Sequence, residues 1–283
     1  MCRLFIYKGI EINIKKIIWN AENSIFKQAY HKVYTPLLNN RRDSQLNVDG
    51  FGLSIYNKTY NKPCLYKNII PPWNDSNILN LLNILSSNLL FVHIRSIKAF
   101  SNNQFVHQFN SHPFCFENIS FMHNGDISNP ECLKKYVYEN ISENLIKNIK
   151  GNTDSELIFH IFLDELKKIE NNKVIKGNKK WIEALKKTIK IIENITKGVS
   201  SMNLCITDGN NILCSRYINS KIEEPPSLYY NKKFLNVDYG INEKSIIISS
   251  EPILYSNTSD WNLIPKNSLI SINSDNIIEI IIL

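Results

Sequence analysis

The chain has 283 residues, of which 43% are hydrophobic and 21% charged, and its 33 Lys and Arg against 26 Asp and Glu give a formal net charge of +7. This composition is typical of a folded globular protein and excludes a disordered chain. No segment approaches the roughly 20 apolar residues that span a bilayer, and the first residues lack a signal-peptide pattern. We therefore expect a cytoplasmic protein with no membrane partner.

The excess of basic residues is weak evidence for nucleic-acid binding. Ile occurs 45 times and Asn 40 times, and both, like Lys, are encoded by codons rich in A and T. We attribute the bias to genome composition, so nucleic acid is not an expected partner. Salt-sensitive binding of RNA or DNA would revive that alternative.

The hydrophobic pattern predicts strands early, helices in the middle and strands again late. In chain order the expected elements are strands at 4–7 and 50–56, a helix at 78–85, strands at 89–94 and 119–123, a helix that opens at Asn129-Pro130, helices at 154–169 and 181–195, and strands at 203–207, 212–217, 245–249, 268–272 and 277–283. This order argues for antiparallel sheets covered by helices, an α+β layered fold. A boundary near residues 170–180 is an alternative to one continuous domain.

Among six cysteines with no C-x-x-C pair, Cys2 has an unusual position. Initiator Met is normally removed before a small residue, which would leave Cys2 with a free α-amine. Such an amine is partly neutral near pH 7 and can act as the general base for its own thiol. We expect no disulfide framework in this chain.

Three further segments carry side chains suited to catalysis or binding. Asn124-Gly125 follows a strand and supplies either an oxyanion hole or a plain hairpin turn. Asp154 follows Thr153 in a T-x-x-E capping box, where it can serve the helix dipole or bind an ammonium group. Arg95 ends a buried strand and either pairs with a carboxylate of the protein or holds one of a ligand.

We expect no metal and no cofactor. His107, His112 and Cys115 form H-x4-H-x2-C, which matches no common zinc spacing. His112-Pro113-Phe114 is interpreted instead as a turn beside a pocket.

Taken together and in order, these motifs resemble the class II glutamine amidotransferases, which are N-terminal-nucleophile hydrolases. A second set of motifs is similar to the branch that contains the amidotransferase-type subunit of the fungal glutathione-degrading complex. The resemblance runs from residue 2 to about residue 270, so a single amidotransferase-like domain over 2–283 is expected. The first set comprises Met1-Cys2-Arg3, Asp49-Gly50-Phe51-Gly52, His93-Ile94-Arg95, His112-Pro113-Phe114, His123-Asn124-Gly125 and Thr153-Asp154-Ser155-Glu156; the second comprises Pro72-Trp73-Asn74, Thr207-Asp208-Gly209, Ser215-Arg216-Tyr217, Ser250-Glu251-Pro252 and Asp260-Trp261.

The resemblance implies a four-layer α/β/β/α sandwich of antiparallel sheets and a role for each site residue. Cys2 would be the nucleophile, with Asn124 and the Gly125 N–H as oxyanion donors. Arg95 would bind the α-carboxylate of a γ-glutamyl group and Asp154 its α-ammonium group. The remaining predicted substrate-binding residues are His112 and His123.

Three functions are weighed. The first is hydrolysis of glutathione to glutamate and cysteinyl-glycine together with a peptidase-like partner. The second is a glutaminase or ammonia-donating subunit that acts on glutamine, and the third is a catalytically silent binding subunit. Lys98 stands where family members that hydrolyse glutamine usually carry Thr or Ser, and the segment 96–108 is longer than expected. We expect Lys98 to pair with the glycine carboxylate of glutathione.

Overall fold

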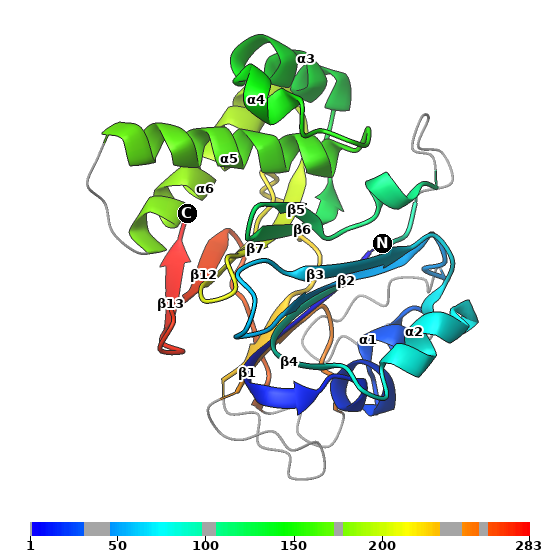
Figure 1. Ribbon diagram of the computed structural model, residues 1–283. Helices are drawn as coiled ribbons and strands as arrows, with labels where there is room; N and C mark the ends of the chain where they lie inside the picture. The colour runs from blue at the N-terminus through cyan, green and yellow to red at the C-terminus, as the bar shows by residue number, and fades with distance from the viewer. Residues whose placement is uncertain (1, 31–45, 98–105, 173–177, 233–244, 255–259) are drawn as a thin grey trace. The chain divides into compact units, whose positions relative to one another are not determined.

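The computed structural model describes residues 2–30, 46–97, 106–172, 178–232, 245–254 and 260–283. These residues form two compact units, each assembled from separate parts of the chain (Figure 1). Unit 1 comprises Met1–Ser120 and Ser227–Ile264, and unit 2 comprises Phe121–Pro226 and Pro265–Leu283. The units do not divide at residues 170–180, where a boundary was the alternative. The single amidotransferase-like domain stays a prediction.

Unit 1 is built on a seven-stranded sheet in the order β11-β9-β10-β1-β4-β2-β3, and every strand pair in it is antiparallel. The strands are β1 (Arg3–Asn13), β2 (Phe51–Tyr56), β3 (Cys64–Asn68), β4 (Ser86–Ile94), β9 (Tyr229–Asn231), β10 (Ile246–Ser249) and β11 (Asn262–Leu263). Short helices accompany them: η1 (Lys16–Asn20), α1 (Ile25–Gln28), η2 (Pro72–Asn74), α2 (Ser76–Leu81) and η3 (Gln108–Asn110).

The two central strands of this sheet are buried on both faces, which explains their uninterrupted apolar sequences. In β1, Phe5 and Tyr7 belong to the core that η1, α1 and α2 cover. Leu4 and Ile6 alternate with them and are also buried. A strand with two buried faces reads as a continuous hydrophobic run rather than as an alternation.

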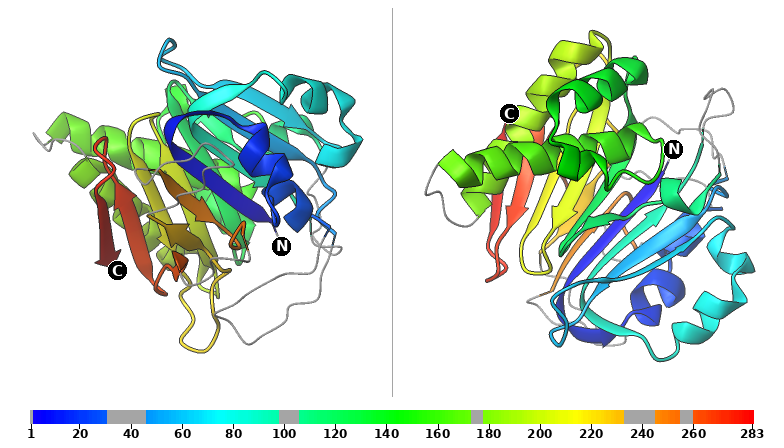
Figure 2. Two further views of the ribbon diagram at one scale, coloured as in Figure 1. Left: turned by 90° about the horizontal axis from the view of Figure 1, so that it is seen from below. Right: turned by 45° about the horizontal axis from the view of Figure 1, so that its top comes forward.

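Unit 2 carries most of a six-stranded sheet in the order β13-β12-β8-β7-β6-β5; β5 and the first two residues of β6 belong to the residues of unit 1. The strands are β5 (Phe114–Phe116), β6 (Ile119–Asp126), β7 (Ser201–Thr207), β8 (Ile212–Arg216), β12 (Ser268–Ile272) and β13 (Ile278–Ile282). Its helices are α3 (Pro130–Asn140), α4 (Glu143–Ile146), α5 (Asp154–Asn172) and α6 (Asn178–Thr196). The two long helices α5 and α6 lie side by side over one face of these strands (Figures 1 and 2).

Aromatic contacts join the long helices of unit 2 to the sheet and to each other. Phe121 of β6 stacks on Phe159 of α5 with ring centroids 5.1 Å apart. Phe162 of α5 meets Trp181 of α6 edge to face at 6.0 Å. The predicted α+β class and the two long amphipathic helices are therefore confirmed.

One local prediction is wrong. The sequence predicts a turn at Asn124-Gly125, but β6 continues through both residues to Asp126. Gly125 is needed for close strand approach instead, because a Cβ there would lie 1.9 Å from the Ser201 carbonyl oxygen of β7. Among the described residues, no helix is long and apolar enough to cross a membrane.

Candidate active site

In unit 1, strand pairing brings Cys2 beside the segment that follows β4. Arg3 is the register partner of Ile94 across the β1–β4 ladder, so Cys2 lies opposite Arg95. The Ser96 N–H donates to Cys2 Sγ at 3.4 Å, and the thiol lies 3.7 Å from the Ser96 carbonyl oxygen. An N–H that points at sulfur stabilises negative charge on it. The predicted nucleophile and the predicted carboxylate-binding arginine are therefore neighbours.

The backbone of Cys2 is braced by the residue that follows it. Arg3 forms a buried ion pair with Glu251, with Nε and Oε1 3.0 Å apart. The same guanidinium donates from its NH1 to the Cys2 carbonyl oxygen at 3.1 Å. Both residues stand in motifs of the sequence, but the sequence alone assigns neither of them a role.

The Asp49-Gly50 turn holds the segment that carries Arg95. The Arg95 N–H donates to the Gly50 carbonyl oxygen at 2.8 Å, and the Ile97 N–H donates to Asp49 Oδ2 at 2.6 Å. Gly50 has a φ of +105°, a conformation that L side chains rarely adopt. The backbone of this motif therefore fixes Arg95, whose side chain is buried.

His112, also in unit 1, packs against the same strand. Its ring centroid lies 4.1 Å from that of His93 on β4 and 4.7 Å from that of Phe114. Gly52 of β2 permits this approach, since a Cβ there would lie 2.2 Å from the His112 carbonyl oxygen. His112 is buried and belongs to the aromatic packing around His93 of β4.

In unit 2, the last part of β6 presents the two predicted oxyanion donors. Asn124 is 1% exposed, and neither Nδ2 nor Oδ1 of its amide has a hydrogen-bond partner among the described residues. A buried amide without partners costs about 1–3 kcal/mol. Such a side chain is expected where a ligand completes its hydrogen bonds.

His123 links this strand to the start of α5. Its Nε2 lies 3.2 Å from the Ser201 carbonyl oxygen, which only accepts, so Nε2 carries the hydrogen. Its Nδ1 lies 2.9 Å from Ser155 Oγ, and Ser155 in turn donates its N–H to Asp154 Oδ1 at 2.7 Å. The contacts connect the neighbour of Asn124 to Asp154.

The loop before α5 confirms half of the predicted capping box. Thr153 Oγ1 accepts from the Glu156 N–H at 3.2 Å. The Glu156 carboxylate reaches further back and accepts from the Lys150 and Gly151 N–H groups at 2.9 and 2.7 Å. Asp154 is thereby held in the first turn of the helix, half-buried.

The structure thus joins the predicted residues into two sets. Unit 1 holds Cys2 next to Arg95, and unit 2 holds Asn124 and Gly125 on one strand with Asp154 linked through His123. Lys98 and most of its loop lie outside the described residues. Within the described ranges, no group of three or more His, Cys, Asp or Glu side chains is arranged to bind a metal.

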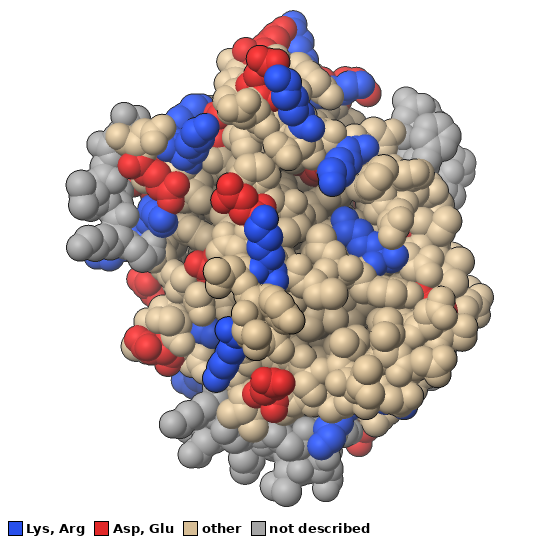
Figure 3. Space-filling model, in the orientation of Figure 1, with Lys and Arg blue, Asp and Glu red and all other residues tan. Residues whose placement is uncertain are grey.

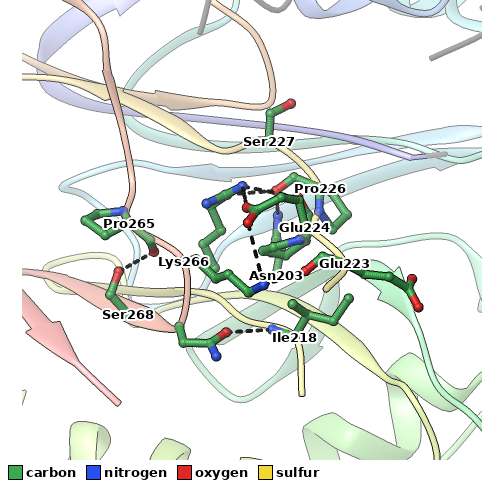
Figure 4. Close-up of polar contacts among 12 residues, drawn as sticks. Asn203, Ile218, Glu223, Glu224, Pro226, Ser227, Pro265, Lys266 and Ser268 are labelled. Carbon is green, nitrogen blue, oxygen red and sulfur yellow. Dashed lines mark hydrogen bonds and ion pairs between the residues drawn. The ribbon is translucent and has the colours of Figure 1, made fainter. Parts of the chain in front are cut away.

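The Ser215-Arg216-Tyr217 motif has a structural role in unit 2. Arg216, at the end of β8, is fully buried and donates through Nε to the Pro226 carbonyl oxygen at 3.2 Å. Its NH2 forms an ion pair with Glu224 at 3.0 Å. Figure 4 shows Glu224 and Pro226 within this cluster, where Asn203 also donates to the Pro226 carbonyl oxygen at 2.8 Å. The motif therefore anchors the segment that follows β8.

On the face drawn in Figure 3, Lys and Arg are interspersed with Asp and Glu and form no continuous basic field. Among the described residues, some opposite charges pair along helices, such as Lys168 with Asp164 and Lys147 with Glu143, both at 2.7 Å.

A family model of the class-II glutamine amidotransferases matches residues 32–281. The chain therefore belongs to the class-II glutamine amidotransferases. It is also 32% identical over 306 aligned residues to a protein of Saccharomyces cerevisiae named probable glutamine amidotransferase DUG3. That alignment covers 98% of this chain and 83% of the yeast protein.

Two solved structures share the fold. A glutamine aminotransferase class-II domain protein from Silicibacter pomeroyi has a TM-score of 0.65 at 21% identity and covers 99% of this chain and 98% of its own. The glutamine phosphoribosylpyrophosphate amidotransferase of B. subtilis has a TM-score of 0.60 at 13% identity and matches 99% of this chain but 48% of its own. The predicted α+β fold of the N-terminal-nucleophile hydrolase type is confirmed.

Family membership also confirms that the chain is an enzyme that acts on amide bonds. The matched span begins at residue 32, so it contains Arg95, Asn124, Gly125 and Asp154 but not Cys2. The alignment with the yeast relative covers 98% of this chain.

Proposed function

We propose that the enzyme hydrolyses a γ-glutamyl amide through a thioester on Cys2, and that glutathione is its substrate. The observation that carries this proposal is the position of Cys2 just beyond the Arg3–Ile94 pair of the β1–β4 ladder, next to the segment Arg95–Ser96, with the Ser96 N–H on the sulfur. A nucleophile next to a buried arginine suits a substrate with a carboxylate close to its reacting amide. The γ-glutamyl group has that arrangement.

The chemistry follows from the residues. The Cys2 thiol attacks the γ-carbonyl carbon, and its proton passes to the Cys2 α-amine once Met1 has been removed. The oxyanion takes hydrogen bonds from the Asn124 amide and the Gly125 N–H. The C–N bond then breaks, and the leaving amine takes the proton. Water hydrolyses the thioester, which releases glutamate and restores the thiol.

Arg95 and Asp154 separate the two charges of the substrate. The guanidinium of Arg95 binds the α-carboxylate, and the carboxylate of Asp154 binds the α-ammonium group. His112 and His123 position the residues that bind the substrate. His112 packs against His93, two residues before Arg95, and His123 connects to Asp154 through Ser155. A γ-glutamyl zwitterion uses both charges.

The motifs that this chain shares with the branch containing the glutathione-degrading amidotransferase subunit extend through Ser250-Glu251-Pro252. They support glutathione as the leading substrate and a peptidase-like chain as partner. The products would be glutamate and cysteinyl-glycine, and the partner would cleave the dipeptide. The protein would act in the cytoplasm, where glutathione is abundant.

A second candidate is hydrolysis of glutamine, which the names of the family and of the yeast relative both favour. The chemistry is the same, but the leaving group is ammonia. The two substrates differ beyond the scissile amide, so competition between them ranks the two functions.

Active-site labelling tests the proposal. The chain with Met1 removed is incubated with a γ-glutamyl diazoketone, and the adduct is mapped by peptide mass spectrometry. We expect one adduct on Cys2 in the wild type and in Cys132→Ala, a matched control that removes an exposed thiol, and none in Cys2→Ala. Protection by glutathione at lower concentration than glutamine supports the leading substrate, and the reverse order supports glutaminase. An adduct on another residue contradicts the proposed nucleophile.

A further inference from the structure

The start of β1 is held by an unusual concentration of polar contacts. The Leu4 N–H donates to Ser250 Oγ at 2.8 Å, and the Ser250 N–H donates back to the Leu4 carbonyl oxygen at 2.9 Å. Next to this pair, Arg3 and Glu251 form their ion pair with side chains only 9% and 2% exposed. Ser250 and Glu251 therefore hold Leu4 and Arg3, the two residues that follow Cys2, in place.

The Glu251 carboxylate is itself fixed from the other side. Asn23 Nδ2 lies 3.5 Å from Glu251 Oε2 and donates to the Pro252 carbonyl oxygen at 2.8 Å. Gln28 Nε2 donates to the Glu251 carbonyl oxygen at 3.4 Å. Both amide side chains are buried, so the acceptor for Arg3 has little freedom to move.

Burial of this ion pair needs a reason other than stability. Removing two charges from water costs about as much as their attraction returns, so a buried pair is weak evidence for stabilisation. The guanidinium of Arg3 does something that an apolar pair cannot do, since its NH1 donates to the Cys2 carbonyl oxygen at 3.1 Å. That bond sets the orientation of the Cys2 peptide plane.

We propose that Arg3 and Glu251 form a positioning pair that fixes the backbone of Cys2 for nucleophilic attack. Glu251 orients the Arg3 guanidinium, and Arg3 orients the Cys2 carbonyl group. The thiol of Cys2 thereby stays at the Ser96 N–H. The inference rests on the proposed role of Cys2 as nucleophile, and neither residue of the pair touches the substrate.

A double variant separates positioning from folding. Replacing one partner leaves a buried charge, so Arg3→Met and Glu251→Met are each expected to lower Tm strongly. Replacing both removes the charges together, so R3M/E251M is expected to have a Tm within about 4 °C of the wild type. The double variant still lacks the donor to the Cys2 carbonyl oxygen.

The experiment measures labelling of Cys2 by the γ-glutamyl diazoketone at several reagent concentrations. These data give the inhibition constant of the reagent and the maximal rate of labelling separately. For R3M/E251M we expect an inhibition constant within about threefold of the wild type and a maximal labelling rate about 100-fold lower, since misplacement by about 1 Å costs that much. E251Q keeps an oxygen for Arg3 and should label faster than the double variant. A folded double variant that labels at the wild-type rate overturns the inference and leaves the proposed function intact.

If the wild type binds no γ-glutamyl analogue, the proposed function is overturned. The positioning role is then tested by the rate at which iodoacetamide alkylates Cys2. This reagent needs no γ-glutamyl site. Loss of the Ser96 N–H from the sulfur is expected to slow alkylation of Cys2 at least threefold in R3M/E251M, because the thiolate is the reactive form. An unchanged or faster alkylation of Cys2 overturns the positioning role.

Discussion

Replacement of Asn124 by Leu is expected to raise the stability of the fold and abolish most of the activity. Asn124 is 1% exposed, and both polar atoms of its amide lack partners among the described residues. A Leu of similar volume removes an unsatisfied buried amide, which costs about 1–3 kcal/mol. We therefore expect the free energy of unfolding to increase by about 1 kcal/mol or more.

The same replacement removes the side chain that we propose as an oxyanion donor. Loss of such a donor costs about 3–4 kcal/mol of transition-state stabilisation, or about 100- to 1,000-fold in kcat. The rate of glutamate release at saturating substrate measures kcat, and urea denaturation measures the free energy of unfolding. The expected changes have opposite signs, which is typical of a residue kept for function.

Asn203→Leu is the matched control in the same unit. Asn203 is also fully buried, but its Nδ2 donates to the Pro226 carbonyl oxygen at 2.8 Å. Its replacement removes that hydrogen bond, while Arg216 Nε still donates to the same carbonyl oxygen, and should destabilise the fold by about 0.5–1.5 kcal/mol. If Asn124→Leu were destabilised as much as this control, Asn124 would be a structural residue and the oxyanion assignment would lose its support.

Three further predictions concern single side chains. Gly125→Ala should lower the free energy of unfolding by about 1–3 kcal/mol in urea denaturation, because the added Cβ would lie 1.9 Å from a backbone oxygen. Gly198→Ala is the control: its Cβ would meet mainly the Ser128 side chain, which can move, so it should destabilise the fold less. Equal losses in the two variants would contradict this reasoning. Burial lowers the pKa of His160, so stability should fall as pH drops below about 6.5, and His160→Gln should flatten that slope in Tm measurements. Burial raises the pKa of Asp75, but four accepted hydrogen bonds outweigh it and hold the pKa below its usual value; the stability lost in Asp75→Asn at pH 7 should therefore shrink below pH about 4, and a constant difference would refute this.

The hydrogen bonds of His123 show how much of the candidate site could be predicted from the sequence. His123, Asn124 and Asp154 were selected from short motifs, because a strand end followed by Asn-Gly and a capped helix start have recognisable local patterns. Their connection through Ser155 and the Ser201 carbonyl oxygen joins segments about 30 and 80 residues apart in the chain. No local pattern encodes such a distance.

Arg3 and Glu251 show the same limit more clearly. Both were quoted as motif residues, yet their ion pair links the second residue after the start of the chain to a segment near its end. The partner of a buried charge is set by which strands are neighbours, and β1 lies between β10 and β4. That order is a property of the folded sheet.

The short elements were missed for a related reason. The strands β3, β5, β9 and β11 and the helices α1 and α4 have at most five residues each, too few for a hydrophobic period to stand out. The strand β6 was shortened in prediction because Asn-Gly usually marks a turn. Contact with β7 overrides that preference.

The sequence by itself determined the α+β class, the two long helices and the family, and it predicts Cys2, Arg95, Asn124 and Asp154 as site residues, because each depends on local periodicity or on a short motif. Tertiary structure decided what holds those residues: the Ser96 N–H at the Cys2 sulfur, the Arg3–Glu251 pair behind it, and the close approach of Gly125 to Ser201. These contacts depend on strand order and register, which arise only when distant segments bury their apolar faces together.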